Sequence, residues 1–360
     1  MSSTLVLKYE GHNYFRQRLV MATLAGRVVK IDKIRHQAER PGLEDFEASF
    51  LRLLDKISNG STIDIGYTGT SMIYKPGILT GGKINHDCPS SRGIGYFLEA
   101  LLVLAPFCKN PLTVRLTGVT SNDLDLSVDT LRTVALPQLL KFGVAEDAQL
   151  RIAKRGSAPL GGGEVHFSCP IANGVQPVQL VDEGRIKRIR GIIYSTRVAP
   201  EIPNRVVSSA RSVLNRFIPD IYLYTDVFKG ADAGRSSGYG ISLVAESTTG
   251  ALLSAEMAGS SDQPPEEFGR LAAKQLLKEI DRGGVFDSNT QWMALLMMVL
   301  SSEDVSKVRL GKLTEFTIQY LRDLKQMFGV TFKIKPDPAT KTVLLTCVGT
   351  GYINIGKKRN

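Results

Sequence analysis

The feature of this sequence that most limits its fold is an order of helices and strands that recurs three times. Each copy predicts a helix, a strand, a second helix and two further strands within roughly 75 residues. In the last copy the expected segments are 289–300, 306–310, 314–328, 330–335 and 342–348. The copies share this pattern rather than residue identity. The recurrence predicts an α/β (α+β) fold whose large domain contains three similar units.

The two earlier copies carry the same pattern. In the first, we expect helices at 15–24 and 43–57 and strands at 4–9, 28–35, 63–67 and 72–75. The helix over 43–57 places Phe46, Phe50 and Ile57 on one apolar face. In the second copy, we expect helices at 91–104 and 127–142 and strands at 112–118, 149–155 and 164–169.

Extra residues separate the second copy from the third. They predict strands at 189–196, 220–227, 239–247 and 250–256, one helix starting at Pro203 and another running to Ile280. Apolar positions in this stretch suffice for a small hydrophobic core. The expected organisation is therefore a large three-repeat domain, 1–184 plus 285–360, and a smaller inserted α/β domain, 185–284.

Composition narrows the class of partner. A formal net charge of +10 and a pI near 9.4 favour a polyanion such as RNA or DNA, without proving specific binding. No apolar run approaches the ~20 residues of a membrane span, and Met1 opens no signal peptide, so we expect a soluble, intracellular protein with no membrane partner. The four cysteines show no CxxC spacing and are expected to be reduced, mostly buried thiols: Cys88, Cys108, Cys169 and Cys347.

Basic residues gather at the expected strand-to-helix turns, where outward-pointing backbone N–H groups can hold a phosphate. Arg16 and Arg18 follow the first such turn, Arg35 and Arg40 lie in the second, and Lys312 precedes the last long helix. Arginine's planar fork favours phosphate recognition, which makes these five residues candidate anion or RNA ligands. The alternative is that they cap helices and pair with acids.

The repeats also predict which turns correspond. If the three copies assemble symmetrically, the turns 35–42, 117–123 and 309–314 occupy equivalent positions. We expect functional sites at these turns, because each joins the end of a strand to the start of a helix.

Other motifs favour structural interpretations. His86, Asp87 and Cys88 are adjacent and cannot easily converge on one point, and no other histidine has ligand spacing, so no metal site is expected. The glycine-rich segment 156–163 precedes a strand rather than a helix, which predicts a hairpin turn rather than a dinucleotide loop. The basic run 185–190 is either a solvated face or a contact for RNA or a partner.

The last long helix carries a second candidate site. Arg322, Asp323 and Lys325 lie together in the sequence. An acid flanked by two cations is suited to phosphodiester chemistry, in which the cations stabilise developing charge. An ion-paired helix surface is the alternative.

Several stretches together resemble the RNA 3′-terminal phosphate cyclase family, over nearly the whole chain. They are Arg35–Leu43, Arg155–Val165, Gly184–Val198, Glu246–Gly250 and Glu266–Gly284. The resemblance implies three repeated α/β units with a smaller inserted domain. It also implies an ancestral reaction in which ATP adenylates a histidine, AMP passes to an RNA 3′-phosphate, and a 2′,3′-cyclic phosphate closes.

The chain departs from the cyclase pattern where that reaction needs it most. The resemblance aligns the nucleophilic histidine with Leu313, whose side chain has no lone pair to attack a phosphate. A glycine-rich turn of cyclases is replaced here by the bulkier residues 12–15, which would crowd a nucleotide. The Asp-Gln pair of cyclases corresponds to Thr290-Gln291, so a carboxylate is lost. Cyclisation is therefore not expected.

The resemblance narrows further to the cyclase-like branch, whose members are nucleolar factors of small-subunit (40S) ribosome assembly. That branch is implicated in early pre-rRNA cleavage toward 18S rRNA, with a Bms-type assembly GTPase and a U-class small nucleolar RNP. Arg18, Arg35 and Arg40 are retained, so a phosphate-sized anion site can persist without adenylation or a cofactor. The implied location is the nucleus and nucleolus.

Three hypotheses follow. The first is a non-cyclising pre-rRNA processing factor that works through its partner surface and its anion pocket. The second is a pre-rRNA endonuclease that acts directly through Arg322, Asp323 and Lys325. The third is an active cyclase, which requires a nucleophile other than the missing histidine.

Overall fold

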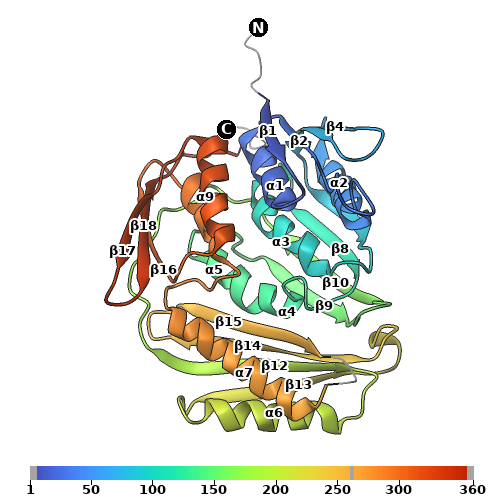
Figure 1. The fold of residues 1–360 in the computed structure, drawn as a ribbon, viewed down its shortest axis with the longest axis vertical. Coiled ribbons are helices and arrows are strands. Elements are labelled where there is room, and N and C mark those ends of the chain that lie inside the picture. Colours follow the sequence, from blue (N-terminus) through green and yellow to red (C-terminus); the bar gives the residue numbers. More distant parts are fainter. Residues whose placement is uncertain (1–5, 260–262, 355–360) are drawn as a thin grey trace.

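A computed structural model describes residues 6–259 and 263–354. Figure 1 shows three α/β repeats packed together, with a smaller domain beside them at the lower end of the view. The mixed α/β architecture predicted from the sequence is confirmed. Positions 4 and 5 of the first expected strand lie outside the described residues.

Each repeat of the large domain follows the order β-α-β-α-β-β. In the first repeat the elements are β1 (Leu7–Glu10), α1 (Phe15–Ala25), β2 (Val29–Asp32), α2 (Asp45–Ile57), β4 (Thr62–Ile65) and β5 (Met72–Lys75). The sheet has the order β1-β2-β5-β4, in which β1 and β2 are parallel and the other neighbours are antiparallel. Two short strands, β3 (Ser58–Asn59) and β6 (Ile78–Leu79), pair separately.

The second and third repeats reproduce this topology. The second contains β7 (Gly82–Asp87), α3 (Ile94–Leu104), β8 (Leu112–Gly118), α4 (Val128–Thr130), α5 (Leu136–Leu140), β9 (Gln149–Lys154) and β10 (Gly163–Cys169). The third contains β11 (Gln179–Leu180), α8 (Gln291–Leu300), β16 (Val305–Leu310), α9 (Glu315–Phe328), β17 (Lys333–Asp337) and β18 (Thr342–Val348). Their sheet orders, β7-β8-β10-β9 and β11-β16-β18-β17, match that of the first repeat.

The sequence pattern missed the strand that opens the second and third repeats. β7 contains His86 and Asp87, for which no strand was predicted, and pairs in parallel with β8. No apolar run marks β7, because polar residues occupy most of it, and β11 has only 2 residues. Since β11 opens the third repeat, the insert lies inside that repeat rather than before it.

The helix predicted over 127–142 is interrupted. It consists of α4, a π-helical stretch at Leu131–Ala135, and α5. Pro137 lies in the first turn of α5 and has no N–H to donate to the helical ladder. The break follows from this missing donor.

Two helices lie wholly inside the large domain. Every residue of α3 and of α8 is buried, as expected for helices that are apolar on all sides. α1 contacts α3 and α9, and α9 also contacts α8. One hydrophobic cluster includes residues of all three repeats, so the repeats share a single core.

The inserted domain has its own sheet and core. Its elements are β12 (Ile186–Thr196), α6 (Glu201–Leu214), β13 (Ile221–Phe228), β14 (Gly238–Ser247), β15 (Leu252–Gly259) and α7 (Pro265–Arg282). The strand order is β13-β12-β14-β15. α6 and α7 cover one face of this sheet (Figure 1), and a separate hydrophobic cluster fills the space between.

Arg155 ties the insert to the large domain. Its guanidinium donates to both oxygens of Asp129 at 2.6 and 2.9 Å, and to Oδ2 of Asp226, on β13, at 3.1 and 2.8 Å. It also lies 4.8 Å from the ring centre of Tyr194 and 5.5 Å from that of Phe228, both in the insert. Burial opposes the charge of Arg155, but the two carboxylates outweigh it and raise the pKa.

The described helices and the four cysteines were also the subject of predictions from the sequence. No helix within residues 6–259 and 263–354 has the length and apolar character needed to cross a bilayer. All four cysteines are free and buried, as their scattered spacing predicted. Burial raises the pKa of the Cys108 and Cys347 thiols to about 12, which makes them poor nucleophiles at neutral pH.

Replacing Arg155 tests how far the two domains depend on this contact. Arg155→Met leaves the buried carboxylate of Asp129 and the partly exposed one of Asp226 without this cation, so the free energy of unfolding should fall by about 3 kcal/mol in urea denaturation. Arg205→Ala is the matched control, because Arg205 makes a similar two-bond fork to Glu266 on the surface and should cost no more than about 1 kcal/mol. Equal losses in the two variants would contradict the assignment.

Candidate functional site

A hollow of about 720 Å³ lies where the large domain faces the insert. The large-domain wall comes from the N-terminal parts of α1, α3, α8 and α9 and from the turn 122–126. The insert contributes Glu256 and Met257 of β15, with Gln275 of α7. The fold therefore brings chain segments of all three repeats to one polar cleft.

Two of the three turns expected to correspond reach this hollow. The turn after β8 lines it through Asn122 and Asp123, and the turn after β16 through Thr314. The turn 35–42, after β2, holds the same place in its repeat but is not part of the lining. Repetition of topology thus brings only two of these turns to the hollow.

Arg16 is held in the wall of the hollow by α3. Its Nη1 donates to the carbonyl of Tyr96 at 2.8 Å, and its Nη2 to Oε2 of Glu99 at 2.8 Å. Trp292 Nε1 donates to the same carboxylate oxygen at 3.2 Å. Burial raises the pKa of Glu99, and the charge of Arg16 opposes that rise. Most of the guanidinium is therefore committed within the protein, although its buried Nε has no partner among the described residues.

A second arginine, Arg92, is also neutralised by a neighbour. It forms a fork with both oxygens of Asp125, and the N–H of Gly93 donates to the same carboxylate at 2.8 Å. Its guanidinium lies over Phe46 and Tyr96, at 4.9 and 4.6 Å from the ring centres. Burial alone would lower the pKa of Arg92, but Asp125 outweighs it and the pKa is raised.

Glu256 closes the insert side of the hollow. Its carboxyl accepts from the N–H of Ser127 at 2.8 Å and from the hydroxyls of Ser127 and Thr130. Burial raises the pKa of Glu256 to about 7, against these hydrogen bonds, with a further contribution from the charge of Asp129. The hollow therefore contains a carboxyl that changes charge near neutral pH.

Arg18 and Asp323 form a buried ion pair between α1 and α9. Nε of Arg18 donates to Oδ2 of Asp323 at 2.9 Å, and Gln319 donates to the other oxygen at 2.8 Å. Arg322 and Lys325 are exposed, whereas Asp323 is buried. The structure does not bring the three proposed catalytic side chains together, because neighbouring positions on a helix point in different directions.

The remaining candidate anion ligands are also dispersed. Arg35 makes a fork to Glu47 at 2.6 and 3.0 Å, and so fixes the start of α2. Arg40 and Lys312 are exposed in separate turns. Of the five basic residues, only Arg16 lines the hollow.

The residue that the resemblance aligns with the nucleophilic histidine, Leu313, does not line this hollow. Leu313 is partly buried and packs against the core, beside an apolar hollow between α9 and β17. The ring of Phe316 lies 5.1 Å from that of Tyr14 and stacks on Tyr320 at 6.0 Å. Aromatic rings thus fill the space between the N-termini of α1 and α9.

Three of the four histidines offer no replacement nucleophile with evident activation, and the fourth, His12, is exposed in the turn before α1. His86 is buried, its Nε2 lies 2.9 Å from the Ser49 hydroxyl, and burial lowers its pKa to about 4. His36 lies against the carbonyl of Lys33, and His166 contacts Glu164. Within the described residues, no group of three or more His, Cys, Asp or Glu side chains is arranged to hold a metal ion.

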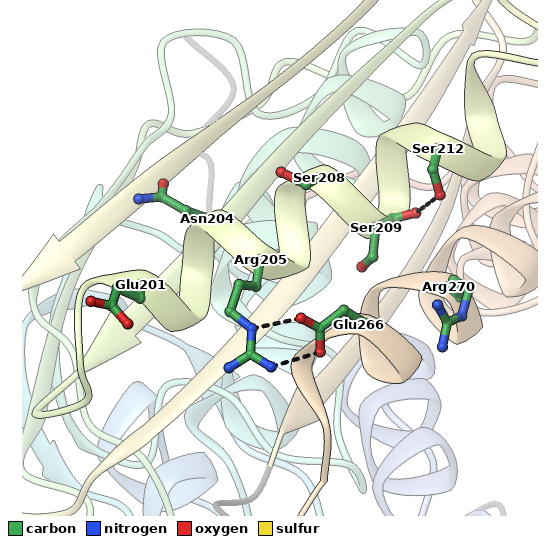
Figure 2. Close-up of a pocket in the computed structure, with 8 residues that line it drawn as sticks. All are labelled: Glu201, Asn204, Arg205, Ser208, Ser209, Ser212, Glu266 and Arg270. Carbon is green, nitrogen blue, oxygen red and sulfur yellow. Dashed lines mark hydrogen bonds and ion pairs between the residues drawn. The ribbon is translucent and has the colours of Figure 1, made fainter.

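A further hollow, of about 620 Å³, lies between α6 and α7 on the insert. Figure 2 shows the two bonds of Arg205 to Glu266 and the hydroxyl of Ser212 donating to the carbonyl of Ser209. It is an open groove between two helices, and the charged pair at its rim is half exposed. It gathers no residues from the large domain, so we take the cleft between the domains as the candidate site.

Sequence reasoning missed Arg92, Glu99, Asp125 and Trp292. Two of them left a signal: Glu99 is the one charge within the apolar segment 94–104, and Trp292 is the one tryptophan of the chain. A charged residue inside an apolar helix needs a buried partner. The identity of that partner, Arg16, depends on how α1 packs on α3.

Asp323→Asn tests whether this carboxylate is structural. Removing the charge facing buried Arg18 should lower the free energy of unfolding by about 3 kcal/mol, measured by urea denaturation. Arg322→Ala and Lys325→Ala, on the exposed side of the same helix, should stay within about 0.5 kcal/mol. A fully stable Asp323→Asn protein that had lost an RNA-cleaving activity would instead support the catalytic assignment.

The chain is similar to known proteins over most of its length. The family model for RNA 3'-terminal phosphate cyclase matches residues 7–334. A protein of Homo sapiens named RNA 3'-terminal phosphate cyclase-like protein is 54% identical, over 98% of this chain and 97% of its own length. rRNA processing proteins are 47% identical in Schizosaccharomyces pombe, over 99% of both chains, and 40% identical in Saccharomyces cerevisiae, over 97% of both. The resemblance read from the sequence is confirmed, and the chain belongs to the RNA 3'-terminal phosphate cyclase family.

Proposed function

We propose that this chain is a non-cyclising member of its family that acts in the processing of pre-rRNA toward 18S rRNA, during assembly of the small (40S) ribosomal subunit. The names of the yeast relatives support a role in rRNA processing. The proposed location is the nucleolus, and the proposed partners are pre-rRNA, a U-class small nucleolar RNP and a Bms-type GTPase.

The observation that carries the proposal is Leu313. At the position that the resemblance aligns with the nucleophilic histidine, the chain has an aliphatic side chain packed against the core. Adenylation needs a lone pair on a nitrogen at that point, and a hydrocarbon side chain has none. A protein that keeps the family fold without its nucleophile is suited to binding rather than to AMP transfer.

The filled space between α1 and α9 supports the same proposal. Tyr14 and Phe316 contact one another there, so a nucleotide entering between these helix N-termini meets rings rather than open backbone. The two arginines lining the cleft, Arg16 and Arg92, each have a carboxylate partner already. A triphosphate would have to displace both partners.

Incubation with ATP labelled on the α-phosphate, in the presence of magnesium, tests the loss of cyclase chemistry. The purified chain should carry no covalent label after denaturing electrophoresis, because no phosphoramide bond can form at Leu313. Leu313→His should stay unlabelled too, since Tyr14 and Phe316 still occupy the site. An active cyclase serves as the positive control.

A second variant at the same position can be followed in cells. After depletion of the chain, expression of Leu313→Ala should restore mature 18S rRNA as well as the wild-type chain does, measured by RNA blotting. A labelled wild-type protein would overturn the non-cyclising assignment. Normal 18S rRNA in depleted cells would overturn the processing role.

We also propose where the GTPase partner docks. A hollow of about 230 Å³ between α9 and β17 is lined mainly by apolar side chains, with Arg322 and Lys325 at its border. Ile318 and Ile334 are 41% and 48% exposed there, and β17 is an edge strand with free backbone groups. An extended segment with apolar anchors and acidic flanks fits this chemistry.

Introducing a charged side chain into this apolar hollow tests whether the partner docks there. Ile318→Asp and Ile334→Asp should each weaken binding of the purified GTPase at least about tenfold, measured by calorimetry, because a carboxylate cannot enter an apolar hollow without loss of hydration. Ile78→Asp is the control, at a residue 56% exposed in the first repeat. Unchanged binding by both test variants would place the partner elsewhere.

A further inference from the structure

The face of the insert's sheet opposite α6 and α7 is only half covered. Over β14 and β15, the large domain packs on it: Thr130 bonds Ser242 between hydroxyls at 2.8 Å, and Gln138 donates to the carbonyl of Leu252 at 3.1 Å. The other half ends at β13, which is the edge strand. Among the described residues, the side chains of β13 on this face are exposed or only partly buried.

Two tyrosines stand on that uncovered half. Tyr222 is 60% exposed and Tyr224 is 41% exposed, whereas Ile221 and Leu223 between them are buried under the helices. Alternate positions of a strand share one face, so the two rings are neighbours, with centres 6.2 Å apart. An exposed pair of large aromatic rings on a flat sheet is a common device for binding a partner.

Cations surround this pair of rings. In the register of the sheet, Arg190 of β12 lies directly beside Tyr222. Arg188 lies two positions before it, on the same side of the strand. From the large domain, Arg132 lies near Tyr224 and is paired with Asp129 at 3.3 Å. Burial raises the pKa of the Tyr224 phenol; the charge of Arg132 opposes this rise, and the charges of Asp129 and Asp226 add to it.

The carboxylates at this surface are already engaged. Asp220 is paired with Arg190, and Glu246 with Lys187 and Arg188. The side chains of these basic residues remain about two-fifths exposed, and ion pairs of that kind contribute little stability. A phosphate can therefore replace or join a carboxylate at these sites at small cost.

We propose that this face of β13 binds single-stranded RNA, with successive bases stacked on Tyr222 and Tyr224 and the phosphates held by Arg190, Arg188 and Arg132. This inference rests on the proposed role in pre-rRNA processing and supplies the surface that the cleft between the domains does not offer. Residues two apart in a strand are about 7 Å apart, a distance suited to unstacked neighbouring bases. The stacking is tolerant of sequence, since every base has a flat face.

The chemistry favours single strands over duplex. A duplex hides its base faces within the stack, so it could use the arginines but not the tyrosine rings. Unpaired segments of a precursor RNA offer both groups at once. The ring pair then supplies preference for unpaired RNA, and the arginines supply dependence on salt.

Fluorescence anisotropy with a labelled twelve-nucleotide oligouridine, and with an RNA duplex of the same length, tests the inference on the full chain. Tyr222→Ala and Tyr224→Ala should each weaken binding of the single strand about tenfold, and the Tyr→Phe variants should bind as wild type because the rings remain. Arg190→Gln should weaken binding and reduce the salt dependence by about one phosphate contact. Tyr67→Ala is the control, because Tyr67 is fully exposed in the turn that follows β4 of the first repeat, outside the insert.

A second measurement does not depend on variants that fold. Oligouridine carrying photoreactive 4-thiouridine, irradiated with the wild-type chain, should crosslink to the peptide containing Tyr222 and Tyr224. Single-strand binding unaffected by either Tyr→Ala change, equal affinity for the duplex, or crosslinks confined to other peptides would overturn the inference. Loss of a protein partner with intact RNA binding would do so as well, by identifying the face as a protein interface.

The cellular assay separates this inference from the proposed function. If 18S rRNA production needs the chain but the purified chain binds no single-stranded RNA, the RNA surface is wrong and the processing role stands. If 18S rRNA is normal without the chain, the processing role is wrong whatever the chain binds.

Discussion

The buried contact of Arg155 with Asp129 and Asp226 fixes the geometry on which the site depends. One guanidinium lies between carboxylates of the two domains and against two aromatic rings of the insert. A charge removed from water is stable only when its partners are held in place, so this contact disfavours sliding of the domains. The cleft between the domains exists because the insert is held at this position.

The cleft is polar, but its charges are largely balanced from within. Arg16 with Glu99 and Arg92 with Asp125 form pairs whose members come from neighbouring elements. Paired charges rigidify a wall, whereas an enzyme that handles phosphates needs cations left free for its substrate. Arg18 is likewise paired, with buried Asp323, and so is not free to bind an anion. In this structure the three arginines thus bind carboxylates of the same chain.

The exposed features lie away from this cleft and are of two kinds. The hollow beside β17 is apolar with a basic border, which suits a peptide segment. The outer strand of the insert presents aromatic rings among arginines, which suits unpaired bases. Both lie at edge strands, where a sheet offers side chains and backbone without further rearrangement. The two surfaces that we propose, one for a protein and one for an RNA, would allow this chain to position one partner relative to the other.

The sequence by itself determined the elements whose signals are local. The spacing of Phe46, Phe50 and Ile57 gave α2, and the alternation in 112–118 gave β8, because burial on one side imposes a period on nearby residues. The strands β7 and β11 escaped because one is mostly polar and the other is very short. The sequence and the family resemblance together also showed that position 313, which aligns with the nucleophilic histidine, is a leucine.

Tertiary structure alone decided what each charged residue does. Arg18 and Asp323 are 305 positions apart, and no local pattern announces that they meet. The sequence placed Asp323 between two cations, but the helix turns it inward and leaves Arg322 and Lys325 outside. Hydrogen bonds and ion pairs act over a few ångströms between segments distant in the chain, so their partners are set by packing and not by sequence neighbours.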